Sequence, residues 1–142
     1  MAEERILVAV GAVVLDEQGR VLLVKHREEK GGFWKGRWIC PGGKLEPGER
    51  IEDGMKREVL EETGLDVELV RPLVPFDRIV RSEGRVELHV IYIDYVARKD
   101  RGEAVPGSDV GEARWVPRES LPAIWDELHE DTRRLLNIAN LA

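Results

Sequence analysis

The 142-residue sequence is poor in cysteine and in side-chain amides. Cys40 is the single cysteine, and the amides are Gln18, Asn137 and Asn140. One cysteine excludes an internal disulfide, and the surrounding segment RWICPGG holds no second cysteine or histidine for a zinc site, so we expect Cys40 to be a small core residue. Few amides beside abundant Lys, Arg and Glu are typical of heat-adapted proteins.

The sequence also lacks long apolar runs and an excess of positive charge. No apolar run approaches the ~20 residues that a membrane span needs, and the N-terminal segment MAEERILVAVGAVVL is acidic where a signal peptide would be basic. We therefore expect a cytoplasmic protein without a membrane partner. The net charge of −6 argues against binding to a nucleic-acid polymer, but it is compatible with a small anionic substrate if a metal ion reverses the local field.

The length and the hydrophobic pattern predict one domain, residues 1–142, with a mixed α/β (α+β) architecture. Two strands flank a turn at Asp16–Gly19, and a helix from Ile51 to Thr63 ends at Gly64, which supplies a left-handed cap. Further strands are expected in 65–81, 85–99 and 114–116, with a short apolar stretch and a PGG turn at 38–43 and helical segments in 117–142.

Three glutamates are crowded into the segment REVLEETG, residues 57–64. On a helix, Glu58, Glu61 and Glu62 share one arc of about 100°. Ile51, Met55 and Val59 fall beside this arc, so the acidic cluster should border the buried face and line the rim of a cavity. Like charges at this spacing repel one another, and something positive must offset the repulsion.

Hard oxygen ligands without histidine or cysteine favour Mg²⁺ or Mn²⁺ over zinc. The glycine-rich loop PGGKLEPGE, residues 41–49, precedes the helix and offers main-chain carbonyls as further ligands. Arg57 can tie a carboxylate of this loop, such as Glu49, to the helix through paired hydrogen bonds. The residues alone therefore predict a divalent-cation site built from one helix and one loop. Gly54 interrupts the helix, which is tolerated most easily where another backbone packs close.

The spacing of these residues resembles the signature of the Nudix hydrolase family. Gly43, Glu49 and the segment REVLEETGL, which ends at Leu65, match every fixed position of that 23-residue motif; Gly54, where many members carry alanine, is a departure. The segments GRWICPGGK and EARWVP are also similar to family sequence. The resemblance implies the Nudix fold, in which a mixed β-sheet lies between helices, and metal-dependent hydrolysis of a nucleoside diphosphate linked to another group.

The resemblance also implies roles for individual residues. Glu58, Glu61 and Glu62 would bind Mg²⁺ or Mn²⁺ together with the main-chain oxygen of Gly42, while Arg57 and Glu49 would form an orienting pair. Glu58 is the first candidate for the general base. In some members a later loop supplies the base, and this choice stays open among Glu103, Asp109 and Glu112.

Candidate contacts with the substrate lie outside the motif. Arg27, in the basic run Lys25–Arg27, resembles a phosphate contact of related enzymes, and His26 is expected to be a surface residue. Phe33 and Trp34 are candidates for stacking on a nucleobase, with core packing as the alternative. Trp125 occupies a region that reads the base in nucleotide-sanitising members, or else it packs a terminal helix. Asp109 is a further candidate.

Two substrate classes compete. The segments GRW, PGGK and IEDG resemble enzymes that cleave nucleoside triphosphates, including oxidised ones, to monophosphate and pyrophosphate, and we favour this function. The loop GSDVGEARWVP resembles ADP-ribose pyrophosphatases, many of which carry Phe in place of Lys44. A third hypothesis is a non-catalytic nucleotide-binding regulatory module, against which the complete glutamate set argues. Members of the family are often dimeric, so a homodimer is also compatible with the sequence.

Overall fold

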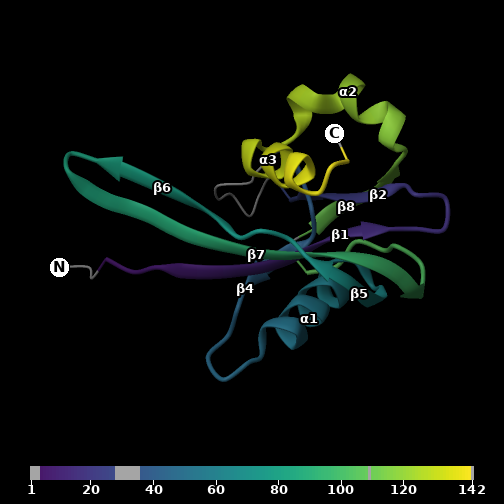
Figure 1. The fold of residues 1–142 in the computed structure, drawn as a ribbon, viewed down its shortest axis with the longest axis horizontal. Helices are drawn as coiled ribbons and strands as arrows, with labels where there is room; N and C mark the ends of the chain where they lie inside the picture. The colour runs from purple at the N-terminus through teal and green to yellow at the C-terminus, as the bar shows by residue number, and fades with distance from the viewer. Residues whose placement is uncertain (1–3, 28–35, 109, 142) are drawn as a thin grey trace.

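The fold is a mixed β-sheet with helices on both faces (Figure 1). The computed structural model describes residues 4–27, 36–108 and 110–141. Its strands are β1 (Leu7–Leu15), β2 (Val21–His26), β3 (Trp38–Ile39), β4 (Gly42–Lys44), β5 (Asp66–Pro72), β6 (Phe76–Ser82), β7 (Arg85–Arg101) and β8 (Val110–Val116). The helices are α1 (Ile51–Thr63), α2 (Leu121–Ile124) and α3 (Glu130–Ile138), and short 3-10 turns flank α2 at Arg118–Ser120 and Trp125–Glu127.

The sheet is organised around β1. This strand pairs in parallel with β7 and antiparallel with β2 and β4, while β5 and β6 both pair antiparallel with the long β7. Helix α1 lies against one face, and α2 and α3 lie against the other (Figure 1). The expected fold class, a mixed sheet between helices, is confirmed.

Successive side chains of β1 point to opposite faces of the sheet and enter two separate core clusters. Val13 points into the cluster that includes Leu128, Leu135 and Leu136 on the α2–α3 side. Its neighbour Val14 points into the opposite cluster with Met55 and Val59 of α1. A strand that is apolar on both faces is typical of a sheet covered on both sides, which explains the continuous run AVVL in this segment.

The predicted helix has the bounds that the sequence indicates. Helix α1 runs from Ile51 to Thr63, and Gly64 adopts the left-handed conformation with φ 75°. Met55 and Val59 are fully buried, as expected, but Ile51 is 39% exposed because it begins the first turn, beyond the edge of the core. Asp16 closes the predicted β1–β2 turn by accepting hydrogen bonds from the main-chain N–H groups of Gln18 and Arg20.

Two expectations about the elements were wrong in detail. The glycines of the PGG segment form the short strand β4, which pairs with β1, instead of a plain turn. A Cβ on Gly42 would lie 2.6 Å from the carbonyl oxygen of Val10, so the close pairing requires glycine there. The strand near position 114 begins earlier, at Val110. The expected C-terminal helical segments are present as α2 and α3. Among the described residues, no helix is long and apolar enough to cross a membrane.

Candidate active site

Helix α1 presents the three glutamates at one edge of the sheet. The side chains of Glu62, Glu58 and Glu61 are 6%, 14% and 50% exposed, so the cluster runs from a buried position to the rim. The loop after β7 is tied to the end of the same helix. Val105 and Gly107 donate main-chain hydrogen bonds to the carbonyl oxygens of Thr63 and Glu62, at 2.8 and 3.0 Å.

Arg57 donates several hydrogen bonds to the carboxylates of this cluster and to the loop before the helix. Its guanidinium donates two hydrogen bonds to the Glu49 carboxylate, from Nε at 2.5 Å and from Nη2 at 2.9 Å. Further hydrogen bonds reach Oε1 of Glu58 at 2.9 Å, Oε2 of Glu61 at 3.2 Å and the carbonyl oxygen of Lys44 at 3.2 Å. The predicted pairing of loop and helix through Arg57 is therefore present. It lowers the pKa of Glu49 to about 2, chiefly through the Arg57 hydrogen bonds.

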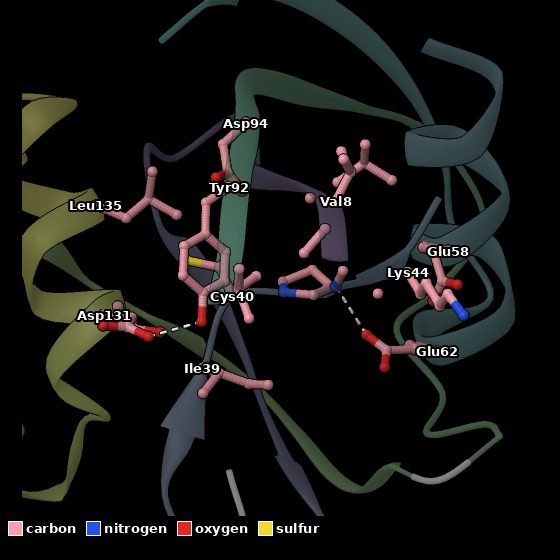
Figure 2. A pocket seen from close by; sticks show the side chains of 18 of the residues that line it. Val8, Ile39, Cys40, Lys44, Glu58, Glu62, Tyr92, Asp94, Asp131 and Leu135 are labelled. Atoms are coloured by element: carbon pink, nitrogen blue, oxygen red, sulfur yellow. Dashed lines mark hydrogen bonds between the residues drawn. The ribbon is translucent and has the colours of Figure 1, made fainter. Parts of the chain in front are cut away.

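Glu62 joins the helix to β4 and to the end of β2. Its Oε1 accepts a hydrogen bond from the main-chain N–H of Gly42 at 2.9 Å, and its Oε2 lies 3.4 Å from Nε2 of His26. His26 and Glu62 both line the cavity that Figure 2 shows. His26, expected at the surface, is therefore half-buried beside the acidic cluster.

The glutamates open into a cavity of about 420 Å³, a size suited to a small ligand (Figure 2). One end is lined by Glu58, Glu61, Glu62, His26 and the glycines of β4. The other end lies between the sheet and α3. Its lining includes the apolar and aromatic side chains Ile39, Cys40, Phe76, Tyr92 and Leu135 and the polar side chains Asp94, Asp131 and Thr132.

The two ends differ in electrostatics. Burial is the largest influence on Glu58 and raises its pKa, and the neighbouring charges of Glu62 and Glu61 act in the same direction, whereas Arg57 opposes them. At the other end, burial raises the pKa of Asp94 to about 7. Burial also raises the pKa of the Cys40 thiol, so this cysteine is an unreactive wall of the cavity.

The donor set at the glutamate end suits a hard divalent cation. Three carboxylates line the cavity beside the glycines of β4, and a Cβ on Gly43 would overlap the Glu58 carboxylate, so glycine leaves this approach open. Within the described part of the chain, no three acidic, histidine or cysteine side chains already stand in a metal-binding arrangement. Arg57 donates hydrogen bonds to Glu58 and Glu61, and the main-chain N–H of Gly42 donates one to Glu62.

The other predicted site residues do not line the cavity or lie outside the described residues. Arg27 is exposed and packs against Gly111, and Trp125 packs against the core cluster of α3; neither lines the cavity. Lys25 lies over the Trp38 ring. Glu103 and Glu112 are exposed and do not line the cavity, although Ser108 does. Phe33, Trp34 and Asp109 lie outside the described residues.

Sequence reasoning missed the far end of the cavity. Tyr92, Asp94 and Asp131 line it, and none of them is among the candidate site residues that the sequence indicates. One signal was present in the sequence. Asp94 continues the inward series Val90, Tyr92, Asp94, so an acidic residue stands at a position where the pattern demands an apolar one. Asp131 gave no such signal, because acidic residues are ordinary in the first turn of a helix.

Comparison with known proteins agrees with this geometry. The family model described as NUDIX domain matches residues 5–136. Nucleoside triphosphatase NudI of Enterobacter sp. (strain 638) is 31% identical over 126 residues, covering 84% of this chain and 87% of that protein. The protein of the same name from Escherichia coli (strain K12 / DH10B) is 30% identical over 135 residues, covering 90% of this chain and 93% of that protein.

Solved structures show the same fold. A MutT NUDIX hydrolase from Burkholderia pseudomallei superimposes with a TM-score of 0.80 at 29% identity, covering 95% of this chain and 98% of that one. A MutT protein from Methanosarcina mazei Go1 has a TM-score of 0.79 at 24% identity, covering 99% of both chains. The chain therefore belongs to the Nudix family, and it is a hydrolase of the class that acts on diphosphate bonds and generally requires a divalent metal.

Proposed function

We propose that this enzyme hydrolyses nucleoside triphosphates, oxidised ones included, to a nucleoside monophosphate and pyrophosphate, with Mg²⁺ or Mn²⁺ as cofactor. The observation that carries the proposal is the two-ended cavity. Three glutamates stand at one end, where a metal-bound polyphosphate would lie, and an aromatic and apolar chamber at the other end suits a base. The relatives named nucleoside triphosphatase, which match most of the chain, support this substrate class.

In this proposal Glu58, Glu61 and Glu62 hold the metal together with the main-chain oxygen of Gly42. The bound metal would neutralise phosphoryl oxygens and lower the pKa of a water ligand. Arg57 orients the carboxylates, because it contacts Glu58 and Glu61 directly and is itself fixed by Glu49.

Glu58 is our candidate for the general base. Burial raises its pKa, which makes the carboxylate a better proton acceptor than an exposed glutamate. Glu103, Asp109 and Glu112 remain alternatives for this role. The attachment of the 103–112 loop to the end of α1 keeps that loop beside the glutamates.

The same attachment favours a second candidate substrate, ADP-ribose or a nucleotide sugar, because the loop that resembles ADP-ribose pyrophosphatases is held at the metal end. Arg27, Phe33, Trp34, Asp109 and Trp125 are retained as proposed substrate contacts in either case. A non-catalytic binding module is the third candidate, and measurable turnover would exclude it. We propose that residues 1–142 act as one cytoplasmic domain, alone or as a homodimer, which sedimentation would distinguish.

The test is a comparison of kcat/KM across the common nucleoside triphosphates, oxidised dGTP, ADP-ribose and nucleotide sugars, each with Mg²⁺ and with Mn²⁺. We expect a nucleoside triphosphate to be the best substrate and Glu62→Gln to remove the activity. Glu52→Gln, which changes an exposed glutamate in the first turn of the same helix, is the matched control and should leave the activity intact. A clear preference for ADP-ribose would replace the first candidate with the second.

A further inference from the structure

The far end of the cavity contains a carboxyl group, that of Asp94, for which the described residues supply no hydrogen-bond partner. Asp94 lines the cavity and is 7% exposed. Among residues 4–27, 36–108 and 110–141, its carboxyl group has no hydrogen-bond or ion-pair partner, and burial is the one influence that acts on its ionisation. A buried carboxyl group without a partner lowers the stability of the folded protein, so its presence suggests a ligand that satisfies it.

Asp131, the second acidic residue at this end, differs from Asp94 because protein groups donate hydrogen bonds to its carboxylate. Oδ2 of Asp131 accepts a hydrogen bond from the Tyr92 hydroxyl at 2.6 Å (Figure 2). Oδ1 accepts one from Nη1 of Arg78 at 3.2 Å. Both oxygens of Asp131 are thus engaged within the protein. This contact fixes the Tyr92 ring, which stacks on Phe76 with a centroid distance of 4.9 Å. The chamber therefore has rigid aromatic walls and one carboxyl group whose hydrogen-bonding capacity is unused.

The strands leave room for this carboxyl group above a glycine. Gly11 of β1 is the Cα partner of Asp94 in β7. A Cβ on Gly11 would lie 2.8 Å from Oδ1 of Asp94 and 2.8 Å from the carbonyl oxygen of Pro41. Asp94 therefore occupies the space above a glycine. Because Tyr92 precedes it by two residues on the same face of β7, a flat ring in contact with Tyr92 would bring its edge to Asp94.

We propose that Asp94 selects the base of the nucleotide by hydrogen bonding to the polar edge of its ring. This inference rests on the proposed function and adds the residue that distinguishes a nucleotide from other polyphosphate esters. The ligand class is a heterocycle in which a hydrogen-bond donor adjoins an acceptor. The raised pKa supports the match, because a carboxyl group that keeps its proton near neutral pH both donates and accepts.

The test compares two substrates in several variants. The substrates are the nucleoside triphosphate that the wild type prefers and ribose 5-triphosphate, which has no base. Asp94→Val removes both hydrogen-bonding atoms, whereas Asp94→Asn keeps one donor and one acceptor. Asp100→Val, at an exposed position of the same strand, is the matched control. Asp94→Ala, which needs no extra space, repeats the test if the valine variant does not fold.

For the preferred nucleotide, we expect Asp94→Val to lower kcat/KM by at least about 10-fold, the scale expected for one lost hydrogen-bonding group, mainly through KM. The Asp94→Val variant should leave kcat/KM for ribose 5-triphosphate unchanged. With the preferred nucleotide, kcat/KM of Asp94→Asn should stay within a few-fold of the wild-type value, and Asp100→Val should not change it. Melting temperatures at pH 8 should not fall in Asp94→Val, since an unsatisfied carboxyl group has been removed.

Two results would overturn the assignment. Equal losses on both substrates would mean that Asp94 supports the fold or the metal end instead of the base, and unchanged kinetics on both would mean that it contacts no substrate. These outcomes are distinct from a failure of the proposed function. A wild-type protein that hydrolyses no nucleoside triphosphate would overturn the function itself, and the base-selecting role with it.

Discussion

The ionisation of Asp94 makes the stability of the protein depend on pH. Burial raises its pKa from 3.8 to about 7. Because the folded state holds the proton more tightly than the unfolded chain does, this group stabilises the fold most below pH 4, and the contribution is lost as the pH rises through 7. The pKa values of Asp94 in the folded and unfolded states differ by about three. Each pKa unit corresponds to about 1.4 kcal/mol, so the full effect on the free energy of unfolding is about 4 kcal/mol at most.

The assay is denaturant unfolding in EDTA at pH 5 and at pH 8 for the wild type, Asp94→Asn and Asp100→Asn. Between these two pH values, the wild type should lose about 3 kcal/mol of unfolding free energy relative to Asp94→Asn. Asp100→Asn, at an exposed position of the same strand, should follow the wild type. If the wild type and Asp94→Asn change in parallel between pH 5 and pH 8, the Asp94 carboxyl group is not buried and unpaired in solution, and the reasoning fails.

Three further predictions concern the glutamate end. Glu62→Gln should lower kcat by about 100-fold or more while the circular dichroism spectrum stays native, and it should abolish the rise in melting temperature that Mg²⁺ gives the wild type; near-normal turnover would refute its role. Arg57→Lys should cost about 1 kcal/mol of stability and at least 10-fold in kcat/KM, because lysine cannot make the two-point contact with Glu49; kinetics equal to wild type would show that the pair is only a surface contact. Gly43→Ala should displace the Glu58 carboxylate and reduce activity more than stability, as parallel kinetic and melting measurements would reveal; unchanged kcat would contradict it.

Local sequence signals were sufficient to predict how the residues at the glutamate end lie relative to one another. One helix and the loop before it supply these residues, and helical periodicity together with residue chemistry relates them. Glu58 and Glu62 therefore lie at the edge of the buried face as expected, and Arg57 contacts Glu49 as expected. The glycine at position 54 has a local explanation as well, although it is side chains that pack there: a Cβ would lie 2.7 Å from both Glu49 Oε1 and Leu45 Cδ1.

The far end of the cavity could not be predicted in the same way, because it depends on contacts between distant segments. Tyr92 and Asp131 are 39 residues apart, and their hydrogen bond exists only because α3 packs across the face of the sheet at β7. His26 was expected at the surface for the same reason, since its neighbour Glu62 comes from a helix that begins 25 residues later. For Trp125 the sequence left base contact and packing of a terminal helix open, and in the structure this residue packs against the core and does not line the cavity.

The central claim is that the crowded glutamates serve metal-dependent cleavage of a nucleoside triphosphate to monophosphate and pyrophosphate. The most direct test follows the products by ³¹P NMR as the purified protein acts on its preferred nucleoside triphosphate, with Mg²⁺ and then with EDTA. We expect nucleoside monophosphate and pyrophosphate in equal amounts, formed only when the metal is present. Release of orthophosphate and nucleoside diphosphate, or equal turnover in EDTA, would contradict it.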